Sequence, residues 1–290
     1  MVVVRLMGGM GNQLFQYSFG RALATKLKSD LVLDLTTLLD RTPRENFVFR
    51  EFDLDLFELN TYYIFDEKLK KKYKQKSLFR RLNLEIKEVG FQYSDIYKKV
   101  KKQNVYLDGY WQSYKYFEDI STELREELKF KMPLSHEQNI LADKIRNSKS
   151  VCVNFRRADF VSIPSAIETH GIASLEYYYE AIKILKEKIG SDITVFVFSD
   201  DVEWCESNFI IDLPVIYVQH SLYKGERFSS YLQLMTCCKY FIIPNSTFGW
   251  WAAWLSSSND KIVISPKQWF ADAKLQSQTQ DLRPKTWITI

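Results

Sequence analysis

The feature that most constrains this fold is a regular alternation of short apolar runs and longer helical patterns in the second half of the chain. The apolar runs have the length of buried strands, and the segments between them repeat apolar residues at helical spacing. Such alternation produces a parallel sheet with helices on both faces, a doubly wound α/β domain. The predicted strands are Val151–Phe155, Thr194–Phe198, Val215–Val218, Tyr240–Ile243 and Ile262–Ile264, and the predicted helices are Leu175–Ile189, Val202–Asn208, Ser229–Cys238 and Phe248–Leu255.

The N-terminal half opens with the same kind of unit. A strand at Val2–Leu6, a glycine-rich turn, a helix at Gln13–Leu27 and a strand at Leu31–Leu35 follow one another. We also expect a strand at Val105–Leu107 and a helix near Tyr116–Phe130, whereas the segment between residues 40 and 103 is less regular. A strand, helix and strand in succession predict a second parallel sheet.

The stretch from Pro133 to Ser150 is polar and has the spacing of a connecting helix. We place the domain boundary there, giving an N-terminal domain of residues 1–147 and a C-terminal domain of residues 148–290, whose last residues could pack back on the first domain. Two α/β domains with polar residues at their strand ends suggest a ligand site in the cleft between them.

Composition limits the class of protein. The 290 residues are 46% hydrophobic, which is ample for two cores, and the net charge of +4 does not imply nucleic acid as a partner. The four cysteines lack zinc-site spacing and suit a reducing compartment. No run approaches the roughly 20 apolar residues of a membrane span, so we expect a cytoplasmic protein. The lysine-rich runs Lys68–Lys76 and Lys98–Lys102 could touch anionic lipid at the inner face of a membrane or could be solvated surface.

Two arginines end the first strand of the C-terminal domain, in the run V-C-V-N-F-R-R-A-D-F. In open α/β sheets ligands bind outside the carboxyl ends of the strands, and a guanidinium fork matches phosphate oxygens. Arg156 and Arg157 are therefore a candidate phosphate clamp. The alternative is a surface pair bridged to Asp159.

Other strand ends carry polar groups as well. Gly9, Gly11 and Asn12 lie between a strand and a helix, where the backbone can approach an anionic ligand, although a tight turn would explain the glycines equally well. Asp200 and the pair Ser246 and Thr247 follow two later strands and could bind a nucleotide sugar or cap the next helix.

Histidines and acidic residues offer further candidates. His170 and His220 could act as general bases or could be ordinary loop or core histidines. Asp53 and Asp55 form a D-x-D pair, but alternation with apolar residues favours an edge strand or turn over a metal site. The tryptophans of the run F-G-W-W-A-A-W-L are more typical of a core than of a sugar platform.

Several motifs in the same order resemble glycosyltransferase family 11, the α-1,2-fucosyltransferases. The family's G-G-x-G-N-Q-x-F-Q-Y run is similar to Gly8–Tyr17, and its H-x-R-R-G-D-Y motif is similar to Asn154–Phe160. Similar segments recur at Gly109–Gln112, His170-Gly171, Phe198–Asp201 and Asn245–Trp254.

The resemblance implies a GT-B-like fold of two Rossmann-like domains, an acceptor-side N-terminal domain and a C-terminal domain that binds GDP-fucose. It implies inverting transfer without a required metal or other cofactor, Arg156 on the donor pyrophosphate, and Asn12 near the β-phosphate or fucose. Asp159, Asp200, Ser246 and Thr247 are implied to position the donor.

The chain departs from the family pattern at four positions. The motif histidine is Asn154, the glycine is Ala158, the tyrosine is Phe160, and an acidic residue common before L-Q-L-M is Tyr231. We expect transfer of L-fucose from GDP-fucose to the 2-hydroxyl of a terminal galactose in a glycan or lipid-linked oligosaccharide. The alternatives are another GDP-deoxyhexose or acceptor, or a non-catalytic protein that binds nucleotide sugars or glycans. The general base is open between His170 and Asp159.

Overall fold

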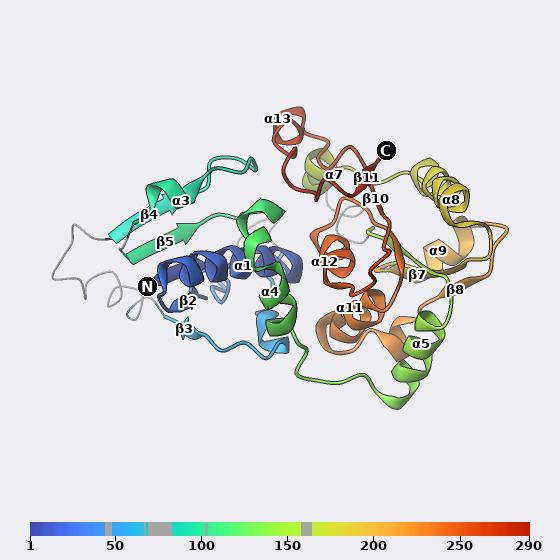
Figure 1. Ribbon diagram of the computed structural model, residues 1–290, viewed down its shortest axis with the longest axis horizontal. Coiled ribbons are helices and arrows are strands. Elements are labelled where there is room, and N and C mark those ends of the chain that lie inside the picture. The colour runs from blue at the N-terminus through green and yellow to red at the C-terminus, as the bar shows by residue number, and fades with distance from the viewer. Residues whose placement is uncertain (44–47, 67, 69–82, 102–103, 158–163) are drawn as a thin grey trace. The chain divides into compact units, whose positions relative to one another are not determined.

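The computed structural model describes residues 1–43, 48–66, 68, 83–101, 104–157 and 164–290 (Figure 1). Two compact units make up this chain: unit 1 comprises Met1–Lys131 with Gln278–Arg283, and unit 2 comprises Met132–Ser277 with Pro284–Ile290. Each contains a parallel sheet, as predicted. Among the described helices, none is long and apolar enough to cross a membrane.

Unit 1 contains a five-stranded sheet in the order β3-β2-β1-β5-β4, and all its described strand pairs are parallel. Its centre is β1, and the chain adds β2 and β3 on one side and β5 and β4 on the other. The order therefore reverses between β1 and β5. The elements are β1 (Val2–Arg5), α1 (Met10–Leu27), β2 (Leu31–Asp34), η1 (Leu54–Leu56), β3 (Tyr62–Ile64), β4 (Asn83–Lys87), α3 (Ile96–Lys99), β5 (Asn104–Asp108), η2 (Tyr114–Tyr116), η3 (Glu118–Ile120) and α4 (Ser121–Glu127).

Unit 2 contains a six-stranded parallel sheet in the order β11-β10-β9-β6-β7-β8. The order reverses between the central strand β6 and its neighbour β9. The elements are α5 (His136–Arg146), β6 (Ser150–Phe155), α7 (Pro164–His170), α8 (Leu175–Ile189), β7 (Thr194–Ser199), α9 (Val202–Asn208), β8 (Val215–Tyr217), α10 (His220–Tyr223), η4 (Glu226–Phe228), α11 (Ser229–Thr236), β9 (Tyr240–Ile242), α12 (Thr247–Leu255), β10 (Val263–Ser265), α13 (Ala273–Gln276) and β11 (Ile288–Thr289).

Helices cover both faces of the unit 2 sheet, so its strands are apolar on both sides. One face packs Val151, Val153 and Val195 against α8 and α9. The residues between them point the other way, and on that face the ring of Phe198 contacts Tyr231 of α11. Figure 1 shows α8 and α9 on one side of this sheet and α11 and α12 on the other.

The predicted C-terminal elements all occur, with ends shifted by a few residues, and Trp250 and Trp251 are fully buried as predicted. Two expectations for unit 1 were wrong in detail. Met10, Gly11 and Asn12 belong to the first turn of α1 and not to the preceding turn. The predicted helix at Tyr116–Phe130 is broken into two 3₁₀ turns and the short α4.

The connecting helix α5 belongs to unit 2, whereas the predicted boundary between residues 147 and 148 lies after it. Leu141 and Ile145 on its apolar face are buried, and the helix packs against α11. The side chain of Gln138 also donates to the carbonyl of Leu222 in α10. The helix α5 is therefore part of the hydrophobic core of unit 2.

Candidate functional site

The strongest constellation of predicted residues lies at the carboxyl ends of β6 and β7 in unit 2. Arg156 Nη1 donates to Asp200 Oδ2 at 2.5 Å, and the backbone N–H of Arg157 donates to Asp200 Oδ1 at 2.8 Å. The two side chains of the Arg156–Asp200 ion pair are 28% and 13% exposed. One carboxylate thus fixes the guanidinium and the backbone that follows it.

Arg157 has a different environment. Its guanidinium lies 3.4 Å from the centroid of the Trp204 ring and pairs with Asp201, with Nε 3.3 Å from Oδ2. A cation on an aromatic face is held by electrostatic attraction and packing. Arg157 therefore anchors the start of α9 to β6, and its predicted contact with the donor stays a prediction.

The sequence left open whether Asp200 caps the next helix. In the structure this role belongs to its neighbour Asp201. Asp201 Oδ1 accepts from the backbone N–H of Trp204 and caps α9, and Ser199 Oγ accepts from the N–H of Asp201. Asp200 does not cap this helix. Its carboxylate is therefore available to the arginine.

Ser246 and Thr247 lie at the end of β9, the strand beside β6 at the point where the strand order reverses. Ser246 occupies the N-cap position of the nine-residue helix α12, but the hydroxyl makes no capping hydrogen bond. The first N–H groups of a helix favour an anion, and ligands of open α/β sheets bind at such reversals. This turn and Arg156 thus lie at one edge of the sheet, where a phosphate could bind.

A cavity of about 450 Å³ opens at the same edge of unit 2. His170, Ser174, Tyr177, Asn245 and Gln268 are among the residues that line it. The side-chain amide of Asn245 donates to the carbonyls of His170 and Trp269, which holds the walls together. The lining also includes Ile172, Pro266 and Ile290, so the cavity is partly apolar, and His170 in its wall is close enough to the candidate phosphate clamp to feel the charge of Arg156.

His170 is the last residue of α7. Burial lowers the pKa of its imidazole, and the positive charge of Arg156 lowers it further. Because its pKa is lowered, the imidazole is neutral near pH 7, so it can accept a proton. The other candidate base, Asp159, lies outside the described residues, as do Ala158, Phe160 and most of the run Lys68–Lys76.

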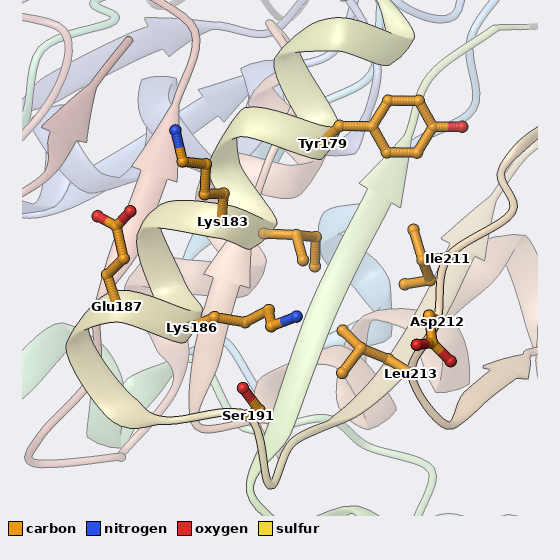
Figure 2. Close-up of a pocket in the computed structure, with 9 residues that line it drawn as sticks. Tyr179, Lys183, Lys186, Glu187, Ser191, Ile211, Asp212 and Leu213 are labelled. Atoms are coloured by element: carbon orange, nitrogen blue, oxygen red, sulfur yellow. The ribbon is translucent and has the colours of Figure 1, made fainter.

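A second, slightly larger cavity of about 500 Å³ lies elsewhere in unit 2. Figure 2 shows it between α8 and the segment Ile211–Leu213, with Tyr179, Lys186 and Ser191 at its edge. Ser191 precedes β7 and Leu213 precedes β8, so the cavity is at the amino ends of these strands. None of the predicted site residues lines it.

Unit 1 has its own cluster at the reversal between β1 and β5. The side chain of Gln112 donates to Asn12 Oδ1 at 2.9 Å, and Gln16 donates to the carbonyl of Gly109. Gly8 has φ +79°, and a Cβ there would lie 2.4 Å from Asn12 Nδ2. The structure is compatible with both interpretations of the glycines. Gly8 makes the tight turn, and Gly9 at the helix N-cap has open space around its Cα that a ligand could approach.

Glu88 is a residue of this cluster that the sequence did not indicate. It follows β4, and its carboxylate accepts from the N–H groups of Tyr110 at 2.6 Å and Trp111 at 2.9 Å. Trp111 is buried and has φ +58°. Burial raises the pKa of Glu88 to about 7 despite these two bonds. The missed signal was β4 itself, whose N-L-E-I-K alternation lies in the segment that we read as irregular.

The D-x-D pair does not form a metal site in the described structure. Asp53 and Asp55 lie at the start of the 3₁₀ turn η1, and the N–H of Asp53 donates to Gln13 Oε1. Among the described residues, no group of three or more histidine, cysteine or carboxylate side chains could hold a metal ion. Independence of a metal stays a prediction.

Comparisons with known proteins agree with the fold and motifs. An alpha-1,2-colitosyltransferase of Escherichia coli is 32% identical over 299 residues, covering 100% of this chain and 98% of that protein. The Escherichia coli O-antigen biosynthesis glycosyltransferase WbnK is 30% identical, covering 98% of this chain and 99% of that protein. A structure of a mutant of Arabidopsis thaliana FUT1 in complex with GDP shares the fold at a TM-score of 0.54 and 11% identity, covering 90% of this chain and 69% of that chain.

The predicted GT-B-like class, with two parallel α/β sheets, is therefore confirmed. The family model for glycosyl transferase family 11 matches residues 1–290, and the chain belongs to this family.

Proposed function

We propose that this glycosyltransferase moves L-fucose from GDP-fucose to the 2-hydroxyl of a terminal galactose, forming an α-1,2 linkage. The observation that carries the proposal is the Arg156–Asp200 pair beside the uncapped start of α12, at the strand reversal of unit 2. That arrangement offers a guanidinium fork and helix N–H groups to a pyrophosphate.

The reaction would be a single displacement. The acceptor hydroxyl attacks the anomeric carbon while the bond to the GDP oxygen breaks, so negative charge grows on the leaving phosphate. Arg156 and the N–H groups at the start of α12 would stabilise this charge, with Ser246 and Thr247 beside them. Preorganised groups of this kind are usually the largest catalytic contribution.

The acceptor hydroxyl must lose a proton during the attack. The neutral imidazole of His170 is a suitable acceptor, since burial and Arg156 lower its pKa. Asp159 remains the other candidate. Asn12, held by Gln112 in unit 1, would approach the β-phosphate or the fucose.

A second candidate keeps the mechanism and changes the donor. A relative of 32% identity is a colitosyltransferase, and colitose is L-fucose without its 3-hydroxyl group. GDP-colitose is therefore the alternative donor. The name of WbnK points to O-antigen biosynthesis in that relative, which makes a lipid-linked oligosaccharide a reasonable acceptor here and peripheral membrane contact a further expectation.

The test is a donor and acceptor matrix in the presence of EDTA. The protein is incubated with GDP-fucose or GDP-colitose and a β-galactoside, and mass spectrometry follows the adduct and free GDP. A fucose adduct linked at the 2-hydroxyl supports the main proposal, whereas an adduct from GDP-colitose alone supports the alternative. Binding of GDP-fucose without turnover would indicate a non-catalytic protein. Dependence on Mn²⁺ would refute the metal-free mechanism and redirect attention to Asp53 and Asp55.

A further inference from the structure

The end of strand β7, immediately before Asp200, is held by side chains where the sheet ladder stops. Val197 is the last residue of β7 paired with β8, opposite Tyr217, and the N–H of Val218 donates to its carbonyl. In a parallel ladder the next two bonds would join Ser199 N–H to Val218 O and Ser199 O to the N–H of residue 220.

Tyr231 and His220 replace both of these bonds. The Tyr231 hydroxyl accepts from Ser199 N–H at 3.3 Å and donates to Val218 O at 2.6 Å, so it stands inside the missing ladder bond. His220 Nε2 lies 2.5 Å from Ser199 O. A carbonyl only accepts, so this nitrogen carries the proton.

Asn154 completes the arrangement from the β6 side. Its side-chain amide donates to Phe198 O at 3.0 Å, and the residue is only 5% exposed. Gly249 of α12 makes room for it, because a Cβ at that position would lie 2.6 Å from Asn154 Oδ1. Phe198 and Ser199 are therefore held by Asn154 of β6 on one side and by side chains of α10 and α11 on the other.

Asn154 and Tyr231 both act on the same dipeptide, Phe198-Ser199. We propose that Tyr231, with Asn154 and His220, is a positioning residue that fixes Asp200 and through it the guanidinium of Arg156. This inference rests on the proposed function, since it assumes that Arg156 binds the donor pyrophosphate. The coupling is direct, because Asp200 is the next residue after Ser199 and binds Arg156 Nη1.

The test compares Tyr231→Phe with a matched control. Tyr217→Phe also removes one hydroxyl donor to a carbonyl, that of Phe209 at 2.7 Å, but away from Asp200. We measure GDP binding by calorimetry, KM and kcat for the donor, and thermal melting. Tyr231→Phe should weaken GDP binding and raise the donor KM about tenfold, the effect of roughly one net hydrogen bond. Tyr217→Phe should leave both unchanged.

A double-mutant cycle separates positioning from general destabilisation. In an Asp200→Ala background, Tyr231→Phe should cause no further loss of GDP affinity, since the group it positions is gone. A full tenfold loss in that background, or wild-type GDP affinity for folded Tyr231→Phe, would overturn the proposal. If Tyr231→Phe does not fold, His220→Ala is tested in the same cycle with the same criteria. If the wild-type protein binds GDP but transfers no sugar, the proposed function fails, while the GDP-binding cycle still decides this inference.

Discussion

Replacing Arg156 by alanine is the perturbation that tests the site most directly. The side chain is 28% exposed and gives Asp200 a charge-assisted hydrogen bond of 2.5 Å. Hydrogen bonds to charged groups contribute about 1.5–3 kcal/mol, and solvent screening lowers that figure here to about 1–2 kcal/mol. Asp200 also keeps its bond from Arg157 N–H. With a typical stability of about 5–15 kcal/mol, the variant should remain folded.

The expected effect on catalysis is much larger. Loss of one preorganised donor to a developing anion costs roughly 100-fold or more in rate, about 3 kcal/mol. The rate of Arg156→Lys should fall between those of the wild type and Arg156→Ala, because an ammonium keeps the charge but not the planar fork. Initial rates of adduct formation with GDP-fucose and a galactoside, followed by mass spectrometry, measure the loss, and circular dichroism confirms the fold.

Arg146→Ala is the matched control. Arg146 pairs with Asp143 on α5, where the two side chains are 50% and 68% exposed. An exposed pair contributes little, so both turnover and melting should match the wild type. A folded Arg156→Ala variant that turns over within about threefold of the control would refute the assignment of Arg156 to the leaving phosphate.

Two further predictions concern unit 1. The folded pKa of Glu88 is raised from 4.5 to about 7, so the folded state holds more protons between these values and its free energy of unfolding falls as pH rises, by up to roughly 3 kcal/mol. In Glu88→Gln this decline should be absent, which urea denaturation at about pH 5 and about pH 8 would measure as the free energy of unfolding. Parallel pH profiles for the wild type and the variant would contradict the prediction. Gly8→Ala should lower turnover, because the new Cβ lies 2.4 Å from Asn12 Nδ2. Gly190→Ala also replaces a glycine with a positive φ but has open space around it, so it should lose about 1–3 kcal/mol of stability and no activity; equal activity losses would contradict the role of Asn12.

Sequence patterns predicted unit 2 well because its strands are buried on both faces. The run Val151–Phe155 is apolar except for Asn154 and is followed directly by two arginines, which marks both the strand and its functional end. The short strands of unit 1 give weaker signals. Tyr62–Ile64 is a three-residue edge strand whose first residue is 61% exposed, so neither its length nor its pattern separates it from a loop.

The same contrast applies to the site. The positions of Arg156 and Asp200 at strand ends could be predicted, because Arg156 follows Phe155 directly and Asp200 comes one residue after the apolar run that ends at Phe198. The sequence could not decide between Asp200 and Asp201 as the helix cap, because that choice depends on the direction in which the chain leaves β7. Glu88 was missed because its hydrogen-bond partners, the backbone N–H groups of Tyr110 and Trp111, are 22 and 23 residues away and meet it through the pairing of β4 with β5.

The two units present different chemical groups at their strand reversals, and we propose that this difference separates their roles. In unit 2 the reversal between β6 and β9 presents a guanidinium and a helix start without a side-chain cap, both suited to negative charge. In unit 1 the reversal between β1 and β5 presents the amides of Asn12 and Gln112, which carry no charge and match hydroxyl groups. A phosphate therefore has a charged partner in unit 2, while a sugar hydroxyl has a neutral one in unit 1. This division fits the proposal that unit 2 binds the donor pyrophosphate and that the amides of unit 1 bind sugar hydroxyls. Charge-removing substitutions in unit 2 should then weaken binding of both GDP and GDP-fucose, whereas Gln112→Ala should weaken binding of GDP-fucose more than that of GDP, because only GDP-fucose carries sugar hydroxyls.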